Sequence, residues 1–164
     1  MFHIDDLIIY GTSGVCVVAD ICPSPFDKTD ARTYYKLCPA DTTAGGVIYT
    51  PVENDRIPMR HLLSREQGEA LLSSVASSPF LDIPVEKQRK DIYKQALLST
   101  EPVRWLGIMR SVRRRGIALL AQRKNLPDLD REFSDRAQKY LTSELSIVLE
   151  RPREEIAEII LANI

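Results

Sequence analysis

The sequence predicts an α+β fold, in which a small SH3- or Tudor-like β-barrel precedes an all-α helical bundle. Short β-rich runs separated by turn residues fill the chain up to about residue 58, and from residue 64 the apolar residues recur at helical spacing. The 164 residues are 44% hydrophobic and 27% charged, which is typical of a soluble globular protein. We expect a β-barrel over residues 1–60, a helix and linker over 61–84, and a helical domain over 85–164.

Two hairpins build the predicted β module, which has four or five short strands. The turn Gly11-Thr12-Ser13-Gly14 joins the first pair of strands, and a turn ending at Gly45-Gly46 joins the second pair. So small a sheet must curl to cover its apolar face, which favours a barrel. Pro51 cannot donate a ladder hydrogen bond, so it belongs on an edge strand or where the pairing stops. The strands that can be placed are 7–10, 15–21, 34–38 and 47–52.

The helical half is marked by caps and prolines. Ser64-Arg65-Glu66-Gln67 is a capping-box pattern, and Pro102 suits the first turn of a helix. Trp105 shares the register of the apolar residues on its helix, so we assign it to the core. The predicted helices cover 64–77, 86–98, 102–124, the stretch between the loop 126–128 and residue 151, and 151–164, with a linker at 77–84.

The charges are sorted along the chain, although the net charge is only −1. Residues 86–124 hold eleven Lys and Arg against three Asp and Glu, whereas residues 1–85 hold six against eleven and residues 125–164 hold five against nine. Such a cationic block favours a polyanionic partner, and nucleic acid is the commonest one. The alternative, helix faces that are simply solvated, stays open.

Catalytic signatures are absent from the sequence. None of the patterns GxGxxG, GxxxxGK[ST], HExxH and GxSxG occurs, and His3 and His61 lie near no nucleophile or relay pattern. The cysteines Cys16, Cys22 and Cys38 form no CxxC pair, so we expect reduced strand thiols rather than a zinc site. No window approaches the roughly 18 apolar residues of a membrane span. We expect a cytoplasmic protein that is not an enzyme and has no cofactor or metal.

Several short motifs follow one another in a distinctive order. They are the opening stretch 2–15, the strand Tyr34-Tyr35-Lys36-Leu37, the stretch 48–54 that ends in Pro-Val-Glu-Asn, and the helix junction 93–102. Arg110, Arg113-Arg114 and the stretch 141–145 continue the series. Together they resemble the CarD family of bacterial transcription regulators. Its β module also occurs as the polymerase-interacting domain of transcription-repair coupling factors.

The resemblance implies that the β module docks on the β subunit of RNA polymerase by pairing one sheet edge with another. We expect Tyr49 to be the main anchor, and the alternative, that Tyr49 merely covers the barrel, stays open. The predicted docking residues are Val47, Ile48, Tyr49, Thr50 and Val52.

The resemblance also implies that the helical half contacts promoter DNA at the upstream edge of the bubble. Phosphate contacts need only Lys and Arg on an accessible face, and Lys87, Lys90 and Lys94 have the spacing of one face. Well-studied members carry a wedge Trp near the start of the first bundle helix, where this chain has Glu86-Lys87. The predicted DNA-binding residues are Lys87, Arg89, Lys90, Lys94, Arg113 and Arg114.

The expected function is a non-enzymatic, nucleoid-associated transcription regulator that binds RNA polymerase and promoter DNA. The alternative is an adaptor whose basic helical face meets an acidic protein. The sequence leaves the oligomeric state open, and also the choice between activation and repression.

Overall fold

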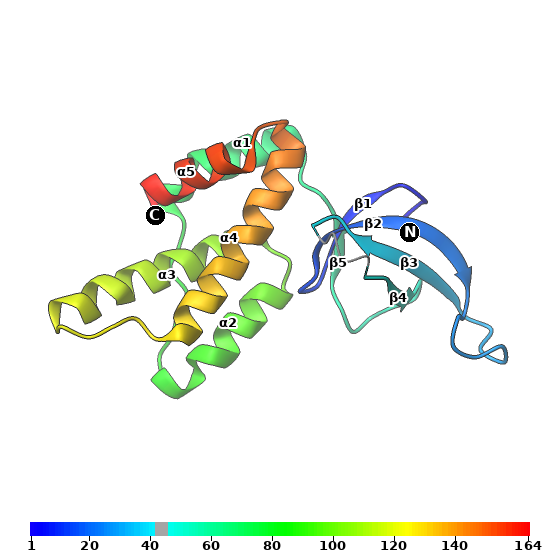
Figure 1. Ribbon diagram of the computed structural model, residues 1–164, viewed down its shortest axis with the longest axis horizontal. Helices are drawn as coiled ribbons and strands as arrows, with labels where there is room; N and C mark the ends of the chain where they lie inside the picture. The colour runs from blue at the N-terminus through cyan, green and yellow to red at the C-terminus, as the bar shows by residue number, and fades with distance from the viewer. Residues whose placement is uncertain (42–45) are drawn as a thin grey trace. The chain divides into compact units, whose positions relative to one another are not determined.

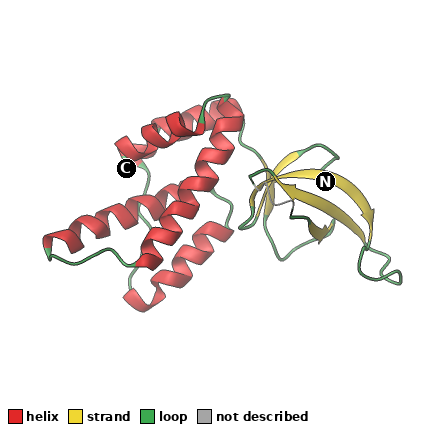
Figure 2. Ribbon diagram, in the orientation of Figure 1, coloured by secondary structure: helices red, strands yellow, loops and turns green. Residues whose placement is uncertain are grey.

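The computed structural model describes residues 1–41 and 46–164, and it divides into two compact units, Met1–Leu62 and Leu63–Ile164. Strands make up the first unit and helices the second (Figure 2), which confirms the α+β class. The segment 63–84, for which the sequence predicts a helix and a linker, is part of the second unit. Gly45, which the sequence places in a hairpin turn, lies outside the described residues.

The first unit is an antiparallel five-stranded sheet with the strand order β4-β3-β2-β1-β5. Both predicted hairpins are present as the pairs β1–β2 and β3–β4, and β2 and β3 form the long curved strands of Figure 1. A register shift between Val18 and Asp20 adds a bulge to β2, which increases strand twist. The strands are β1 (Leu7–Tyr10), β2 (Gly14–Pro23), β3 (Thr33–Pro39), β4 (Ile48–Pro51) and β5 (Met59–His61).

The sheet is open rather than closed. Among the described residues β4 pairs only with β3 and β5 pairs only with β1, so the expected closed barrel is not formed. The two edge strands have only four and three residues, which gives them little length over which to meet. As predicted from Pro51, β4 is an edge strand. The likeness of the sheet to SH3 and Tudor domains stays a prediction.

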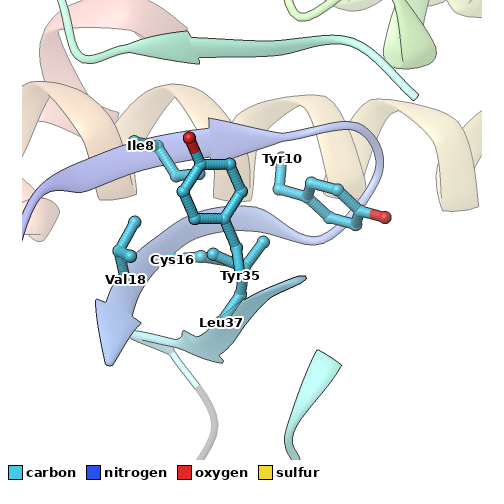
Figure 3. Packing of buried hydrophobic residues seen from close by; sticks show 6 residues of the cluster. All are labelled: Ile8, Tyr10, Cys16, Val18, Tyr35 and Leu37. Carbon is cyan, nitrogen blue, oxygen red and sulfur yellow. The ribbon is translucent and has the colours of Figure 1, made fainter. Parts of the chain in front are cut away.

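The core of the first unit lies on one face of this curved sheet. Cys16 is completely buried there, and burial raises the pKa of its thiol to about 12, so the thiol stays protonated and packs as a small apolar group. Cys22 and Cys38 are half-buried, and all three cysteines are free. Figure 3 shows the central side chains, which are Ile8, Tyr10, Cys16, Val18, Tyr35 and Leu37.

The second unit is helical from Arg65 onward. The capping box predicted at Ser64 is confirmed, because its hydroxyl accepts from the Gln67 N–H and the Gln67 side chain accepts from the Ser64 N–H. The first helix ends earlier than expected, at Ser73, and a 3₁₀ turn follows, Val75–Ser77. The helices are α1 (Arg65–Ser73), α2 (Arg89–Leu98), α3 (Pro102–Ala121), α4 (Asp128–Leu149) and α5 (Arg153–Asn163).

Trp105 lies in the core of the second unit, as predicted. Its side chain is completely buried, its indole N–H donates to the Leu97 carbonyl at 3.2 Å, and its ring centroid is 5.4 Å from that of Tyr140. Trp105 is therefore not available at the surface. Within the described part of the chain, none of the helices combines the length and the apolar character needed to cross a bilayer.

Candidate polymerase-binding and nucleic-acid-binding surfaces

The backbone of β4 offers one outward-facing donor at the open edge of the sheet. In an antiparallel ladder the hydrogen-bonded pairs recur every second residue. The Val52 N–H donates to the Thr33 carbonyl at 2.9 Å, and Thr50 and Ile48 are two and four residues earlier in the same register. Their backbone groups therefore face β3. The N–H and C=O of Tyr49 face away from β3, along the edge.

The side chains of the predicted docking residues divide between two faces. Ile48 and Val52 pack against the core cluster, and Thr50 is only 3% exposed. Tyr49 lies on the opposite face because side chains alternate along a strand, and it is half-buried there. Val47 is exposed just before the strand. Tyr49 and Val47 are therefore the accessible members of the predicted set, and the other three support the sheet.

Tyr49 belongs to a small aromatic patch that was not predicted from the sequence. We define the aromatic patch as Phe26, Tyr34 and Tyr49. The Phe26 ring centroid lies 5.7 Å from that of Tyr49 and 6.3 Å from that of Tyr34, both edge-to-face. Phe26 is 74% exposed, although it is large and apolar. The sequence signal for this patch was Phe26 itself, a single aromatic residue in a Pro- and Asp-rich loop.

The loop that carries Phe26 is fixed by carboxylate hydrogen bonds. Asp30 accepts from the Arg32 guanidinium at 2.7 Å and from the Tyr34 hydroxyl at 2.9 Å, which ties the loop to β3. The hydrogen bonds from Arg32 hold the pKa of Asp30 well below its usual range. Nearer the tip, Asp27 accepts from the Thr29 N–H at 2.8 Å. Phe26 is thus presented by an ordered loop.

In the helical unit, three predicted lysines share an accessible face. Lys87, Lys90 and Lys94 are exposed and follow one another at i, i+3 and i+7. Over the described ranges, no carboxylate lies within ion-pair distance of any of the three. Lys87 is on a 3₁₀ turn, Glu86–Gln88, rather than on the helix predicted to begin there. Arg113, on α3, is also exposed.

Arg89 differs from these lysines because it is buried within an ion cluster. Its side chain is 10% exposed, and its Nε lies 3.1 Å from Oδ1 of the fully buried Asp130, while its Nη1 contacts Glu86. Arg115 approaches the same two carboxylates, with Nη2 2.7 Å from Glu86 and Nε 3.5 Å from Asp130. We call Glu86, Arg89, Arg115 and Asp130 the ion cluster.

Tyr93 completes the surroundings of Asp130. Its hydroxyl donates to Asp130 Oδ1 at 3.0 Å, and burial together with the neighbouring carboxylate raises the pKa of Tyr93 well above its usual value. Local sequence patterns did not predict this arrangement, because Asp130 belongs to α4 whereas Arg89 and Tyr93 belong to α2. The Glu86 and Arg89 spacing of i, i+3 was the one local signal.

Arg114 contacts an aromatic ring instead of a carboxylate. Its guanidinium carbon lies 4.0 Å from the centroid of Phe80, and that of Arg110 lies 4.4 Å from it, which are cation–π distances. Arg110 also donates to the Ser78 carbonyl. The predicted DNA-binding set therefore separates into five exposed cations, of which Arg114 stacks on a ring, and one buried, paired arginine, Arg89. The other four exposed cations are Lys87, Lys90, Lys94 and Arg113.

A comparison with protein families identifies the first unit. Residues 2–63 match the family model described as the CarD-like/TRCF RID domain, and this range includes β4 and the aromatic patch. The resemblance predicted from the sequence is thereby confirmed over these residues. A comparison with curated proteins found no match.

Proposed function

Since residues 2–63 form a CarD-like/TRCF RID domain, an RNA polymerase-interacting domain, we propose that this chain is a non-catalytic regulator of bacterial transcription. In this proposal the first unit binds the β subunit of RNA polymerase and the second unit contacts promoter DNA. It places the protein in the cytoplasm, on the nucleoid. The observation that carries the proposal is the open edge of β4 within the matched domain.

The proposed docking mode is addition of a polymerase strand to β4. An added strand gains affinity from main-chain hydrogen bonds and specificity from alternate side chains. Tyr49 supplies both, because its N–H and C=O face the open edge and its ring contacts Phe26 on the outer face. Pro51 leaves only a carbonyl for the partner and so limits the length of the new ladder.

Two substitutions at Tyr49 separate the two contributions. Tyr49→Val removes the ring and keeps the N–H, whereas Tyr49→Pro also removes the outward N–H without touching the ladder to β3. In a pull-down of purified polymerase β subunit, we expect a loss of about fivefold for Tyr49→Val and a further loss of about tenfold for Tyr49→Pro. Equal binding by both variants, each folded by circular dichroism, contradicts the docking mode.

The DNA contact is supported by the exposed lysines of the second unit. The Lys90→Glu/Lys94→Glu double variant reverses charges on the proposed face, and Lys28→Glu/Lys139→Glu makes the same charge change at exposed positions elsewhere. We expect the first variant to weaken binding of a forked promoter duplex about tenfold more than the second, as measured by fluorescence anisotropy. Equal losses would mean that net charge alone is responsible.

A second candidate function, an adaptor that binds an acidic protein, is favoured by exposed apolar residues late in α3. Ile117 is 63% exposed and Leu120 is 75% exposed, near the arginines of the same helix. Mixed apolar and cationic surface suits a protein partner better than a phosphate backbone. The buried Trp105 and the acidic Glu86 at the position of the family's wedge also favour it. Absence of salt-dependent DNA binding in the anisotropy experiment would select the adaptor.

A further inference from the structure

Glu86 is an exposed carboxylate bound to two guanidinium groups that face a cavity. Its side chain is 61% exposed, and both of its oxygens accept from Arg115, at 2.7 and 3.1 Å. The cavity of about 440 Å³ is lined by Arg89, Arg114 and Arg115 together with Ser111. Three arginines around one small cavity form a strongly cationic lining in which Glu86 is the accessible anion.

The charges of the ion cluster cancel only while Glu86 is in place. Asp130 is fully buried and is held by both arginines and by the Tyr93 hydroxyl. With Glu86 present, two carboxylates balance Arg89 and Arg115. Without it, one carboxylate would face two buried or half-buried guanidinium groups, which is costly unless another anion enters.

The guanidinium donors are also incompletely satisfied. Nε and Nη1 of Arg89 and Nε of Arg115 are buried and close to carboxylate oxygens, but they make no well-aligned hydrogen bond within the described chain. Nε of Arg89 and Nε of Arg115 approach Asp130, whereas Nη1 of Arg89 approaches Glu86. The Glu86 carboxylate therefore has to serve Nη1 of Arg89 together with the two Nη atoms of Arg115. A tetrahedral phosphate has more oxygens in more directions and suits paired arginines.

We propose that Arg89 and Arg115 form a phosphate-binding site, and that Glu86 occupies it in the free protein as an internal competitor. The displaceable member is Glu86, because it lies on a three-residue 3₁₀ turn without a side-chain cap and its exposed ion pairs are screened by solvent. Asp130 stays as the fixed anion that orients both arginines. The exposed Lys87 and Lys90 follow Glu86 in the sequence by one and four residues and attract phosphate to this region.

The identity of the ligand as a DNA phosphate rests on the proposed function, whereas the site itself does not. Free inorganic phosphate has the same chemistry and is the second source to test. If DNA is the ligand, Glu86 lowers the affinity of the free protein for DNA and makes binding depend on a competing anion leaving first. In this role Glu86 regulates the affinity of the basic surface for DNA.

Substitution of Glu86 in the full chain tests the proposal, with Asp91 as the matched control. Asp91 is an exposed carboxylate on α2 that makes no ion pair with Arg89 or Arg115 within the described structure, so Asp91→Ala makes the same charge change. We expect Glu86→Ala to raise the affinity for a forked duplex about fivefold, and Asp91→Ala to change it less than about twofold. The salt slope of Glu86→Ala should steepen by about 0.9 for one added phosphate contact.

Two further variants keep the result interpretable. Arg115→Gln added to Glu86→Ala should remove the gain, because it removes half of the site. Glu86→Gln keeps the shape of the side chain and should raise affinity in the same direction by a smaller factor, which covers the case in which Glu86→Ala does not fold.

Inorganic phosphate gives a readout that does not depend on DNA. At matched ionic strength against chloride, phosphate should raise the melting temperature of Glu86→Ala by about 2 °C and leave the wild-type chain nearly unchanged. Phosphate binding by Glu86→Ala without DNA binding by any variant sustains the site and overturns the proposed DNA contact. Equal behaviour of Glu86→Ala and Asp91→Ala toward both ligands overturns the site.

Discussion

The two units present their candidate binding groups in opposite ways. In the first unit the key groups are the backbone N–H and C=O of Tyr49, whose direction is fixed by the β3–β4 ladder. In the second unit the groups are charged side chains, and each depends on which carboxylate lies beside it. Lys90 remains accessible, whereas Arg89 is neutralised by Glu86 and Asp130.

The two kinds of surface therefore differ in how they respond to substitution. A strand edge survives replacement of its side chains as long as the ladder behind it persists. By contrast, a single neighbouring carboxylate can change the affinity of a basic surface for an anionic ligand. The largest effects are therefore expected from changes in the ion cluster, and the smallest from changes in the loop that carries Phe26.

The largest expected effect follows removal of Asp130. Asp130→Ala leaves Arg89 and Arg115 without their buried counter-ion, and we expect the free energy of unfolding to fall by about 3–5 kcal/mol. Asp128→Ala is the matched control, because Asp128 is also in the first turn of α4 but its side chain is 98% exposed. Its expected loss is below about 0.5 kcal/mol, measured by urea unfolding. Similar losses for both variants would show that the cluster does not stabilise the second unit.

The next largest effect is a difference in salt dependence between DNA binding and polymerase binding. If three or four phosphates are contacted, DNA affinity should fall with a log–log salt slope of about −3. Binding of the polymerase β subunit through a main-chain ladder should lose less than about threefold over the same range of salt. Titrations of one protein preparation with each ligand make the measurement. Equal salt slopes for DNA and for the polymerase β subunit would contradict the proposed difference between the two units.

A smaller effect concerns the aromatic patch. Phe26→Ala removes an exposed ring that contacts Tyr49 and Tyr34, so we expect polymerase affinity to fall about fivefold. The free energy of unfolding should change by less than about 0.5 kcal/mol, because Phe26 is mostly solvated. Ile48→Ala, on the core side of β4, should do the reverse, with a loss of stability of about 2 kcal/mol and little loss of affinity in the folded fraction. A Phe26 variant that binds normally would exclude the patch from the interface.

The smallest effect is the acid dependence of the Phe26 loop. The pKa of Asp30 is lower in the folded chain than in the unfolded chain, so its stabilising contribution is present above the unfolded pKa and is lost as the pH falls through the folded one. We expect Tyr34 ring resonances to keep their neutral-pH positions well below the usual titration range of aspartate. An NMR titration from pH 7 downward measures this, and a midpoint near pH 4 would contradict the Asp30–Arg32 contact.

Local signals predicted much of the fold. Glycine-containing turns identified the hairpins, and the Ser64 capping box located the first helix. The strand β5 was not placed, because its three residues carry no alternation and its partner β1 lies about fifty residues earlier in the chain. The helix start predicted at Glu86 proved to be a 3₁₀ turn.

The candidate surfaces were predictable only in part. The spacing of Lys87, Lys90 and Lys94 placed them on one face because a single helical stretch carries all three. The pairing of Arg89 and Arg115 with Asp130 joins three helices and so leaves no trace in local spacing. The role of β4 as an edge followed from Pro51, but the inward direction of Thr50 needed the register of the sheet.

Amide hydrogen exchange of Tyr49 with and without RNA polymerase is the decisive test of docking through the β4 edge. Free of its partner, the outward N–H of Tyr49 should exchange quickly, while that of Thr50 is already protected by β3. On binding, we expect the Tyr49 N–H to become protected and the exchange of the Thr50 N–H to change little. Continued fast exchange at Tyr49 in a chain that is demonstrably bound to polymerase would contradict docking through the β4 edge.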